Sequence, residues 1–543
     1  MPRIVVLDNL STDGIELLKS DSRIDFDVRT GLTGDELRQV LGEYDGALCR
    51  SGVNITAESL EGNTRLRAIV RAGVGTDNID KLAATRLGIV VMNTPTGNTL
   101  STAEHTITLM LALSRNIAPA NQSLVEKRWD RKKFMGAQVA GKTLGIVGMG
   151  RIGQSVAQRA QALEMRILGY DPFLSPARAA EMGVQMFEDV DSMLPEVDYL
   201  TVHTPLTEQT RGLIGKAQLS MLKPGARLVN CARGGIYDEA ALIEGIESGQ
   251  LGGVALDVYE SEPCTDSPLF GMPRVLCTPH LGASTEEAQT QVAIEGVNLL
   301  VDFLTTGNIR HAVNMTSIDA QTLASMRGYL DLAYRLGLLV GQLDPSAAES
   351  CRLEYRGDIA ERETALLGSS FACGLLTGVL DTAPNIVNAE LLLRDRGIEL
   401  VEDKRPVRGA FASLIRAELS TREGACVVAG TLFGENMPRL VQLGENQLEA
   451  FLDGNLLIFY HKDVPGIIGV VGTICGRHDV NIAQMAVGRA APGGAAIGVL
   501  NLDSSPSEET IAEILAHEAI LKVQSVHLPA AGDLPVWLQG PKS

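Results

Sequence analysis

The sequence predicts an α/β protein with two parallel sheets, followed by two smaller domains of α+β type. From residue 1 to about residue 280, short apolar runs alternate with helical patterns, as in βα units. A glycine-rich turn, Gly148-Met149-Gly150-Arg151-Ile152-Gly153, joins one apolar run to a helical stretch. From residue 455 the expected order is strand, helix, strand, strand, helix, strand, which is the ferredoxin-like order.

The first βα series predicts a parallel sheet with flavodoxin-like connections. Its expected strands cover residues 3–7, 47–50, 68–70 and 89–92, with helical patterns at residues 14–19 and 35–41. A long apolar helix is expected at residues 102–114. The chain then enters a second series of strands.

The second series predicts a Rossmann-type, doubly wound sheet, because its first strand leads into the glycine turn. Its expected strands cover residues 142–147, 166–170, 199–204, 227–230, 254–258 and 275–278. A helical stretch at residues 286–304 follows. This stretch can return the chain to the first domain and make that domain discontinuous.

These patterns predict four domains and a tail. The domains are a first, discontinuous domain (1–96 and 284–315), a second domain that contains the glycine turn (97–283), a third domain (316–452) and a ferredoxin-like domain (453–530). Residues 531–543 form the tail. A chain of 543 residues has room for three or four cores.

The overall charge excludes some classes of partner. The formal charge is −19, which argues against nucleic acid or an anionic membrane as a partner. An anionic substrate must therefore be held by local cations against the overall field.

The cysteines and the N-terminus indicate a cytoplasmic protein. Eight cysteines are scattered along the chain without a Cys-x-x-Cys pair, so we expect no metal site and a reducing compartment. The N-terminus reads as a first strand instead of a signal peptide, and no apolar run reaches membrane-spanning length.

The glycine turn predicts a dinucleotide site. Gly148 permits a tight turn, Gly150 lets the backbone approach a pyrophosphate, and Gly153 allows close packing of helix on strand. Asp171 lies 18 residues after Gly153, where an acid binds the adenosine ribose. Its charge would repel a 2′-phosphate and the next two residues supply no cation, so we expect NAD instead of NADP.

Three polar residues follow strands of the second series: Arg233, Glu262 and His280. The carboxyl ends of parallel strands form one edge of a sheet, where ligands bind. His280 can accept a hydroxyl proton while hydride leaves the substrate, and Glu262 can orient its ring. Arg233 can bind a carboxylate and polarise the 2-oxygen. The three residues therefore predict oxidation of a 2-hydroxy acid.

With these residues in view, the chain resembles the D-isomer-specific 2-hydroxyacid dehydrogenases over nearly its whole length. The resemblance rests on residues 71–80, 93–98, the glycine turn, and residues 230–235, 260–263 and 278–284. Cys264 stands where family members often carry a second proline, which can alter a loop but leaves the three chemical groups intact.

The resemblance implies the catalytic triad Arg233, Glu262 and His280. It also implies a set of cofactor contacts, among which Asp257 faces the nicotinamide amide. Besides the three glycines of the turn, these contacts are Thr76, Arg151, Ile152, Asp171, Thr204, Ala232, Arg233, Asp257, His280, Gly282 and Ala283.

Several basic residues suggest a phosphorylated substrate, 3-phosphoglycerate. Arg50 and Arg71 each follow a strand and can face the cleft. The resemblance places Arg131 and Lys132 near the active site of a neighbouring subunit, but their cluster can equally be a solvated helix face. Asn98, at a helix start, can bind substrate or cap the helix.

Residues 453–530 resemble an ACT domain, a module that commonly binds amino acids at paired interfaces. His461 and Asp463 precede a helix, and Asn481 begins the next strand. Together they can hold a zwitterion such as L-serine, or the module can serve only dimerisation. The region before it resembles the intervening domain of long-form family members, and we expect a dimer or tetramer.

The leading hypothesis is therefore NAD-dependent oxidation of 3-phosphoglycerate to 3-phosphohydroxypyruvate, the first step of L-serine biosynthesis, with feedback by serine through the ACT domain. One alternative is a glycerate or hydroxypyruvate dehydrogenase. Another is an amino-acid-sensing regulator whose dehydrogenase half is inert.

Overall fold

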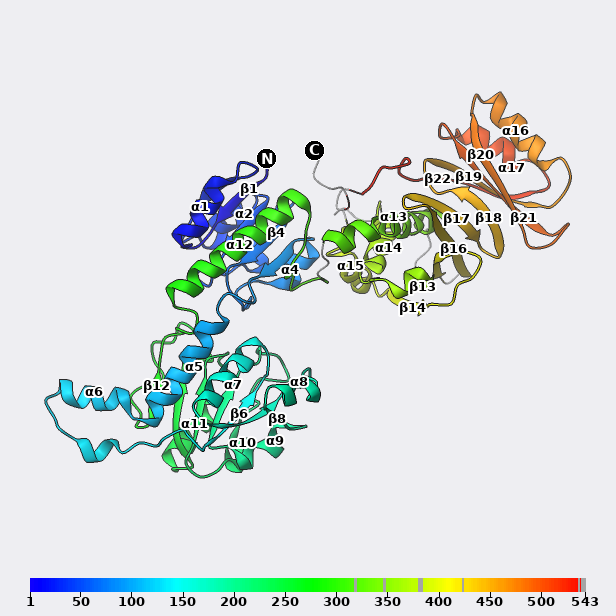
Figure 1. The fold of residues 1–543 in the computed structure, drawn as a ribbon. Helices are drawn as coiled ribbons and strands as arrows, with labels where there is room; N and C mark the ends of the chain where they lie inside the picture. Colours follow the sequence, from blue (N-terminus) through cyan, green and yellow to red (C-terminus); the bar gives the residue numbers. More distant parts are fainter. Residues whose placement is uncertain (317–319, 345–347, 379–383, 422–423, 536–537, 539–543) are drawn as a thin grey trace.

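The structure is a computed structural model that describes residues 1–316, 320–344, 348–378, 384–421, 424–535 and 538. Within these residues the chain forms four sheets, arranged along a bent, extended molecule (Figure 1). The tail predicted after residue 530 lies partly outside the described residues. None of the described helices combines the length and apolarity of a membrane span.

The first sheet is parallel, with strand order β2-β1-β3-β4-β5. Its strands are β1 (Arg3–Val6), β2 (Asp25–Val28), β3 (Gly46–Cys49), β4 (Ala68–Arg71) and β5 (Val90–Asn93). This is the flavodoxin-like order and confirms the predicted fold class.

Helices cover this sheet, and one of them arrives from a distant part of the chain. The connecting helices are α1 (Thr12–Ser20), α2 (Gly34–Leu41), α3 (Ala57–Leu60) and α4 (Lys81–Arg86). The helix α12 (Glu286–Thr306) returns after the second sheet and packs on β3 and β4. The predicted domain boundaries stay predictions, but this return is the path on which they depend.

Sequence reading missed β2, Asp-Phe-Asp-Val, because its alternate aspartates interrupt the apolar pattern. The structure shows what holds one of them. The Asp27 carboxylate accepts hydrogen bonds from the Arg3 guanidinium at 3.0 Å and the Tyr44 hydroxyl at 2.7 Å. A polar edge strand is thus stabilised by paired side chains instead of by an apolar face.

The second sheet is also parallel, in the order β12-β11-β10-β9-β6-β7-β8. Its strands are β6 (Thr143–Val147), β7 (Arg166–Tyr170), β8 (Gln185–Met186), β9 (Tyr199–Val202), β10 (Ala226–Asn230), β11 (Leu251–Leu256) and β12 (Val275–Cys277). This order confirms the predicted Rossmann-type sheet, and the two-residue β8 adds a strand that was not predicted.

The helices of the second sheet include the one that follows the glycine turn, α7 (Arg151–Ala162). The others are α5 (Thr99–Ser114), α8 (Pro176–Glu181), α9 (Val190–Met193), α10 (Lys216–Met221) and α11 (Glu239–Glu247), with the 3-10 turn η2 (Leu194–Glu196). The Rossmann core is closed by fully buried residues such as Val147, Leu228 and Val254.

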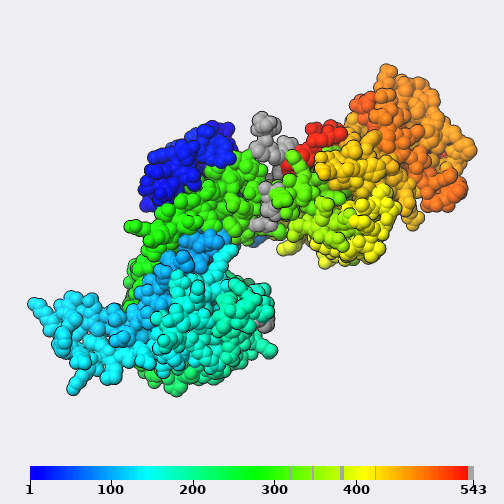
Figure 2. Space-filling model, in the orientation of Figure 1, coloured from blue at the N-terminus to red at the C-terminus, as the bar shows by residue number. Residues whose placement is uncertain are grey.

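An arm projects from this domain in Figures 1 and 2. It contains α6 (Ile117–Val125) and the 3-10 turn η1 (Arg131–Phe134). Its apolar side chains are unusually open to solvent, since Trp129 is 82% and Met135 85% exposed.

The third sheet is mixed, in the order β14-β13-β15-β16-β17-β18. Its strands are β13 (Ala348–Gly357), β14 (Glu399–Arg405), β15 (Ser413–Thr421), β16 (Gly424–Phe433), β17 (Met437–Leu443) and β18 (Asn446–Phe451). Its helices are α13 (Ala320–Leu343), α14 (Leu367–Leu376) and α15 (Ala389–Asp395), with the 3-10 turn η3 (Asp358–Glu361). This is the predicted α+β domain.

The loop before α15 contacts the first domain at the C-terminal end of α4. Asn385 Nδ2 donates to the Gly88 carbonyl at 3.2 Å, and Asn388 Nδ2 donates to the Arg86 carbonyl at 3.3 Å. These bonds join the third sheet's domain directly to the first domain.

The fourth sheet has the order β20-β21-β19-β22 and confirms the ferredoxin-like prediction. Its elements are β19 (Asn455–Lys462), α16 (Ile467–Arg477), β20 (Ile482–Arg489), β21 (Ala495–Leu502), α17 (Glu508–Leu515) and β22 (Ile520–His527). Alternate residues of β19 face opposite sides: Leu457 joins the core under the helices, and Ile458 joins the core shared with the third sheet.

One buried arginine holds the two C-terminal domains together. Arg335 on α13 is 1% exposed and pairs with Asp331 at 2.8 Å. Its other donors reach backbone carbonyls beside the fourth sheet, at distances of 2.7–3.1 Å: those of Leu452, Pro529, Ala530 and Asp533. A buried charge satisfied in this way makes separation of the domains costly.

Candidate active site

The glycine turn has the geometry that a pyrophosphate requires. Gly148 adopts φ +93°, which side-chain-bearing residues rarely adopt. A Cβ on Gly153 would lie 2.1 Å from the Gly148 carbonyl oxygen, so helix α7 can approach β6 only through glycine. A Cβ on Gly150 would meet no described atom within 4 Å. The backbone there is open to a ligand at the N-terminus of α7.

Asp171 lies against the turn, where the prediction placed it. Its carboxylate accepts hydrogen bonds from the Met149 amide at 2.7 Å and the Phe173 amide at 2.8 Å. Lone pairs remain on both oxygens for ribose hydroxyls.

Thr204, on the other side of the turn, has an unsatisfied hydroxyl. Its Oγ1 is buried and finds no hydrogen-bond partner among the described residues. The neighbouring His203, which sequence reading missed, also has a buried, unpartnered Nδ1, and burial lowers its pKa to about 4. A neutral ring and a free hydroxyl beside the glycine turn fit a bound dinucleotide.

Glu262 and His280 meet as the chemistry requires. His280 Nδ1 lies 2.6 Å from Glu262 Oε2, and Glu262 Oε1 accepts the Tyr259 amide at 3.0 Å. Burial would raise the pKa of Glu262, but the His280 ring and the Tyr259 amide hold it below its usual value. The ionised carboxylate fixes the proton on Nδ1 and leaves Nε2 as the free acceptor.

Arg233 extends from the loop after β10 to the first domain. Its Nε donates to Asp77 at 2.9 Å, and its Nη1 donates to the Ala232 carbonyl at 2.6 Å. A Cβ on Gly75 would lie 1.8 Å from Arg233 Nη2, so the guanidinium rests directly on the Gly75 backbone. Sequence reading missed Asp77, although it lies within the motif at residues 71–80.

Three strand ends bring these groups to one edge. The strands β10, β11 and β12 are parallel neighbours, and the Arg233, Glu262 and His280 loops leave their carboxyl ends. Two of these loops touch, because a Cβ on Gly234 would lie 1.8 Å from the Tyr259 carbonyl oxygen. The common location expected from the sequence is thus built by adjacent strands.

Asp257 is the best-connected side chain of this edge. Its carboxylate accepts hydrogen bonds from Thr278 Oγ1 at 2.6 Å, the Leu281 amide at 2.7 Å and the Gly282 amide at 2.8 Å. His105 Nε2 lies 3.2 Å from the same carboxylate. The loop that contains His280, Gly282 and Ala283 is therefore anchored on Asp257.

His105, Cys231 and Asp257 also place three possible metal-ligand atoms within 4.8 Å of one another. Hydrogen bonds fill Asp257 Oδ1 and occupy one position on Oδ2, and burial raises the pKa of Cys231 to about 12. A cation would have to displace the donors that hold the His280 loop. The cluster is better explained as a hydrogen-bond network, and the expectation of no metal stays a prediction.

Arg50 and Arg71 gather near Arg233. Arg71 Nε donates to Asn78 Oδ1 at 3.0 Å, and Asn78 Nδ2 donates to the Arg50 carbonyl at 2.8 Å. Burial lowers the pKa of Arg71, and the nearby Arg233 and Arg50 cations lower it further. The Asp77 carboxylate, which pairs with Arg233 at 2.9 Å, raises the pKa of Arg71 and offsets part of this repulsion.

Thr76 is buried in the same loop, and Lys81 Nζ lies 3.4 Å from its hydroxyl. Two further predicted residues, Arg151 and Ile152, open helix α7, where Arg151 Nη1 donates to the Pro95 carbonyl at 3.4 Å. These positions line the junction of the two N-terminal domains.

Asn98 begins helix α5 but does not cap it with its side chain. Its Oδ1 is buried without a hydrogen-bond partner in the part of the chain that is described. Of the two roles left open by the sequence, the capping role is not realised. An orphaned acceptor fits the binding role instead.

Arg131 and Lys132 lie in η1 on the projecting arm and are exposed. Among the described residues, no hydrogen bond or ion pair joins them to Arg50, Arg71 or Arg233. Within one chain, then, they stand outside the cationic group just described.

The three predicted effector residues lie at two ends of the fourth sheet. Lys462, beside His461 and Asp463, pairs with Ala495 at one end of β21, whereas Ile482, beside Asn481, pairs with Leu502 at the other end. At a rise of ~3.3 Å per residue, the two ends are about 20 Å apart. One chain therefore does not bring His461 and Asp463 to Asn481.

Local partners of these residues differ as well. Asp463 Oδ2 accepts Arg489 Nη1 and the Gly493 amide, both at 2.9 Å. Asn481 Nδ2 donates to Asp503 at 2.7 Å. His461 Nε2 is buried and unpartnered among the described residues.

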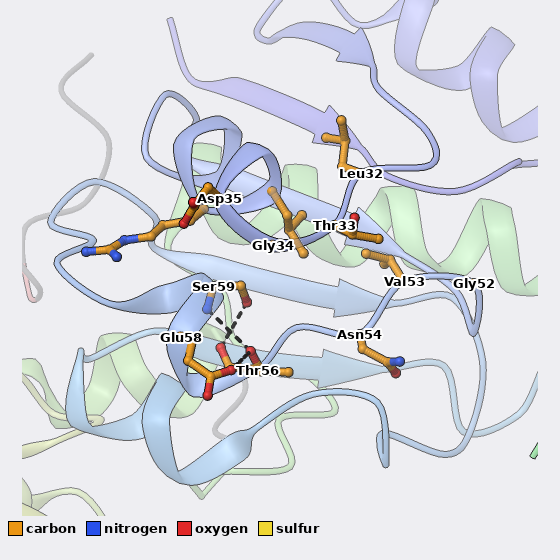
Figure 3. Close-up of a pocket in the computed structure, with 12 residues that line it drawn as sticks. Leu32, Thr33, Gly34, Asp35, Gly52, Val53, Asn54, Thr56, Glu58 and Ser59 are labelled. Atoms are coloured by element: carbon orange, nitrogen blue, oxygen red, sulfur yellow. Dashed lines mark hydrogen bonds between the residues drawn. The ribbon is translucent and has the colours of Figure 1, made fainter.

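A surface pocket of about 400 Å³ lies elsewhere, on the first domain (Figure 3). It is lined by the start of α2, the loop after β3 and the start of α3, and contains none of the predicted site residues. The dashed lines in Figure 3 join Thr56 to Glu58 and to Ser59 at the start of α3. This pocket is therefore not part of the candidate site.

Comparisons with known proteins agree with this site. The family model "D-isomer specific 2-hydroxyacid dehydrogenase, NAD binding domain" matches residues 107–282. The family model "D-3-phosphoglycerate dehydrogenase intervening domain" matches residues 325–444.

Relatives match along almost the whole chain. A D-3-phosphoglycerate dehydrogenase from Synechocystis sp. is 39% identical over 529 residues, 97% of this chain and 95% of the relative. One from Archaeoglobus fulgidus is 39% identical over 529 residues, 97% of this chain and 100% of the relative. Among solved structures, a glyoxylate reductase from Paecilomyes thermophila is 29% identical, with a TM-score of 0.53, over 57% of this chain and 98% of that chain.

Proposed function

Because the chain belongs to the D-3-phosphoglycerate dehydrogenases of the D-isomer-specific 2-hydroxyacid dehydrogenase family, we propose that it oxidises 3-phosphoglycerate to 3-phosphohydroxypyruvate with NAD. This reaction is the first step of L-serine biosynthesis. The observation that carries the substrate assignment is the group of three guanidinium groups, Arg50, Arg71 and Arg233, in a chain of net charge −19.

In this proposal His280 is the base. Its Nδ1 proton is held by Glu262 at 2.6 Å, so Nε2 accepts the proton of the substrate 2-hydroxyl. The resulting cation is stabilised by the ionised Glu262. NAD, when bound, supplies the acceptor for the hydride that leaves C2.

Arg233 binds the substrate carboxylate and polarises the 2-oxygen. Its Nε is already occupied by Asp77, which fixes the plane of the guanidinium and leaves Nη2 at the Gly75 backbone for the substrate. Arg50 and Arg71 then receive the phosphate, and Asn98 supplies a neutral acceptor for a hydroxyl.

The cofactor site in this proposal uses the glycine turn and the residues around it. The amides of α7 receive the pyrophosphate at Gly150, and Asp171 receives the ribose. Thr204 offers its free hydroxyl to the same ligand. Asp257 directly follows β11, beside the loop after β12 that presents His280. This position suits a contact with the nicotinamide amide.

Self-association is part of the proposal. The arm exposes Trp129, Met135 and Val125, and it presents Arg131 and Lys132 beside them. A second copy would cover this apolar surface and receive the two cations near its own substrate site. The eight cysteines are all free thiols, which supports a reducing compartment, the cytoplasm.

Feedback by L-serine is proposed for the ACT domain, across two chains. The unpartnered His461 Nε2 and the Asp463 carboxylate of one chain would face Asn481 of the next. This arrangement is the one compatible with the ~20 Å separation of these residues within a chain.

The direct test measures NADH formation with 3-phosphoglycerate, glycerate and lactate. We expect 3-phosphoglycerate to be strongly preferred. We also expect Arg50→Ala to raise its KM about tenfold or more, because a charge-assisted contact is lost, and to change the KM for glycerate little.

Arg65→Ala is the matched control, since Arg65 pairs with Asp45 on the surface of the same domain at 3.2 Å. Equal effects of Arg50→Ala on phosphorylated and unphosphorylated substrates would contradict the substrate assignment. A preference for glycerate in the wild type would favour the glycerate dehydrogenase alternative.

A further inference from the structure

The Asp257 carboxylate divides its two oxygens between two tasks. Oδ1 accepts Thr278 Oγ1 and the Leu281 amide, and His105 Nε2 lies 3.2 Å from it. Oδ2 accepts the Gly282 amide. Because a carboxylate oxygen accepts about two hydrogen bonds, Oδ1 is filled by protein donors and Oδ2 keeps one free position.

The loop held by Asp257 is strained where it presents the catalytic imidazole. His280 adopts φ +56°, a left-handed conformation that costs energy for a side-chain-bearing residue. Its amide donates to the Asp257 carbonyl at 2.9 Å. Such a conformation persists only if the surrounding structure enforces it.

Helix α5 supplies much of that support from outside the Rossmann strands. Ser101 Oγ and Thr102 Oγ1 donate to the Gly282 carbonyl at 2.8 Å and 3.2 Å. His105 lies one turn further along the same face and reaches Asp257 from there. One side of the helix therefore holds both ends of the 278–282 loop.

The hydrogen bonds around His105 indicate which group donates. Thr278 Oγ1 lies 2.6 Å from Asp257 and 3.2 Å from His105 Nε2, so its proton points to the carboxylate. Nε2 must then carry a proton of its own and donate it to Thr278 Oγ1, with Asp257 Oδ1 at 3.2 Å beside it. The lowered pKa of Asp257, to which the His105 contact contributes against the effect of burial, agrees with an ionised acceptor.

We propose that His105 is a positioning residue: its Nε2 proton holds Thr278 Oγ1, which in turn holds Asp257 Oδ1, so that Oδ2 alone faces the nicotinamide carboxamide, with the His280 loop kept in register. His105 touches neither substrate nor the reacting atoms. The inference rests on the proposed function, because it assumes that Asp257 faces the nicotinamide.

The test compares NAD with its 3-acetylpyridine analogue, whose acetyl group has no N–H to donate to Asp257. In the wild type, the ratio of kcat/KM for NAD to kcat/KM for the analogue reflects the hydrogen bond between the nicotinamide carboxamide and Asp257. We expect His105→Ala to reduce this ratio about tenfold, the value of one hydrogen bond to a charged group. His105→Gln, which keeps a donor at a similar distance, should retain most of it.

Glu104→Gln is the matched control, since Glu104 lies on the same helix and pairs with Arg159 at 3.0 Å, away from the loop. It should leave the ratio at the wild-type value. If His105→Ala does not fold, His105→Asn takes its place, because its shorter side chain keeps the polarity but does not reach Asp257. An equal loss with both cofactors in the variant that folds would overturn the proposal.

Calorimetric binding of the reduced forms of both cofactors separates this proposal from the proposed function. Binding requires no substrate, so the ratio of the two dissociation constants tests His105 even in an enzyme that ignores 3-phosphoglycerate. A wild type that binds NADH but does not oxidise 3-phosphoglycerate would contradict the proposed function alone.

Discussion

Asp257 keeps its charge although its side chain is 0% exposed. Burial alone would raise its pKa, but hydrogen bonds from His105, Thr278 and the Leu281 amide bring it below the ordinary value of 3.8. A carboxyl whose folded-state pKa is depressed stabilises the fold fully above its unfolded pKa. That contribution is lost as the pH falls through the folded-state pKa.

Asp257→Asn should therefore destabilise the protein by about 2–3 kcal/mol at neutral pH, because an amide nitrogen would face the backbone donors of Leu281 or Gly282. The difference from the wild type should be the same at pH 7 and pH 5 and shrink only below pH 4. Urea unfolding followed by circular dichroism measures it. A difference that already declines between pH 7 and pH 5 would speak against a depressed pKa.

The placement of polar residues could be predicted from the sequence where strand ends define it. An acid, an imidazole and a guanidinium after three strands sufficed to expect Glu262, His280 and Arg233 at one edge of the sheet, and Glu262 does contact His280. Asp77 could not be found in this way, because its partner Arg233 lies 156 residues away. His105 reads as one polar residue on an apolar helix until the fold brings Asp257 beside it.

Helix α7 is the element that defines the cofactor site. Its N-cap residue, Gly150, provides no side-chain cap, so the first amides of the helix are left for a ligand. Two glycines at this end of the helix have different tasks. Gly150 faces open space, whereas Gly153 faces the Gly148 carbonyl.

Two matched variants separate these tasks. Gly150→Ala, at φ −66°, should leave the melting temperature of the free protein unchanged. It should weaken NADH binding at least about fivefold, because the methyl group enters the pyrophosphate space. Gly153→Ala should lower the melting temperature by placing a methyl group 2.1 Å from a backbone oxygen. Calorimetric melting and NADH titration of both variants measure the two effects.

If Gly150→Ala bound NADH like the wild type, the pyrophosphate would have to lie elsewhere.

Most strands of the two parallel sheets were predictable because buried strands are continuous apolar runs. The polar strand β2 and the two-residue β8 were not. The strands of the third sheet were not predicted individually, because no sequence motif marks them. In β15, for example, buried and half-buried residues simply alternate.

At the scale of the whole molecule, the fourth sheet cannot complete an effector site alone. His461 and Asp463 lie at one end of β21 and Asn481 lies at the other. The sequence predicted one site for these residues because it does not reveal the strand register that separates them. The contacts of Asn385 and Asn388 with the end of α4 were equally beyond its reach, since nothing local identifies partners 297 and 302 residues away.

Mixed oligomers test the two-chain site. Asp463→Ala and Asn481→Ala should each abolish inhibition by serine. Oligomers reassembled from both variants should regain part of it, because one interface then pairs an intact Asp463 with an intact Asn481. Turnover with 3-phosphoglycerate at increasing serine concentration measures this recovery. Serine-insensitive wild type would remove feedback from the account, and absence of recovery would favour a site within one chain.

Arg335 determines what kind of motion such feedback can use. Separating the ACT domain from α13 would leave the Arg335 guanidinium without its four carbonyl acceptors. The C-terminal half therefore behaves as one rigid unit. A displacement that begins where serine binds would therefore move this half as a whole. It would reach the rest of the enzyme at the contact with the C-terminal end of the short helix α4, a helix that starts only four residues after Asp77.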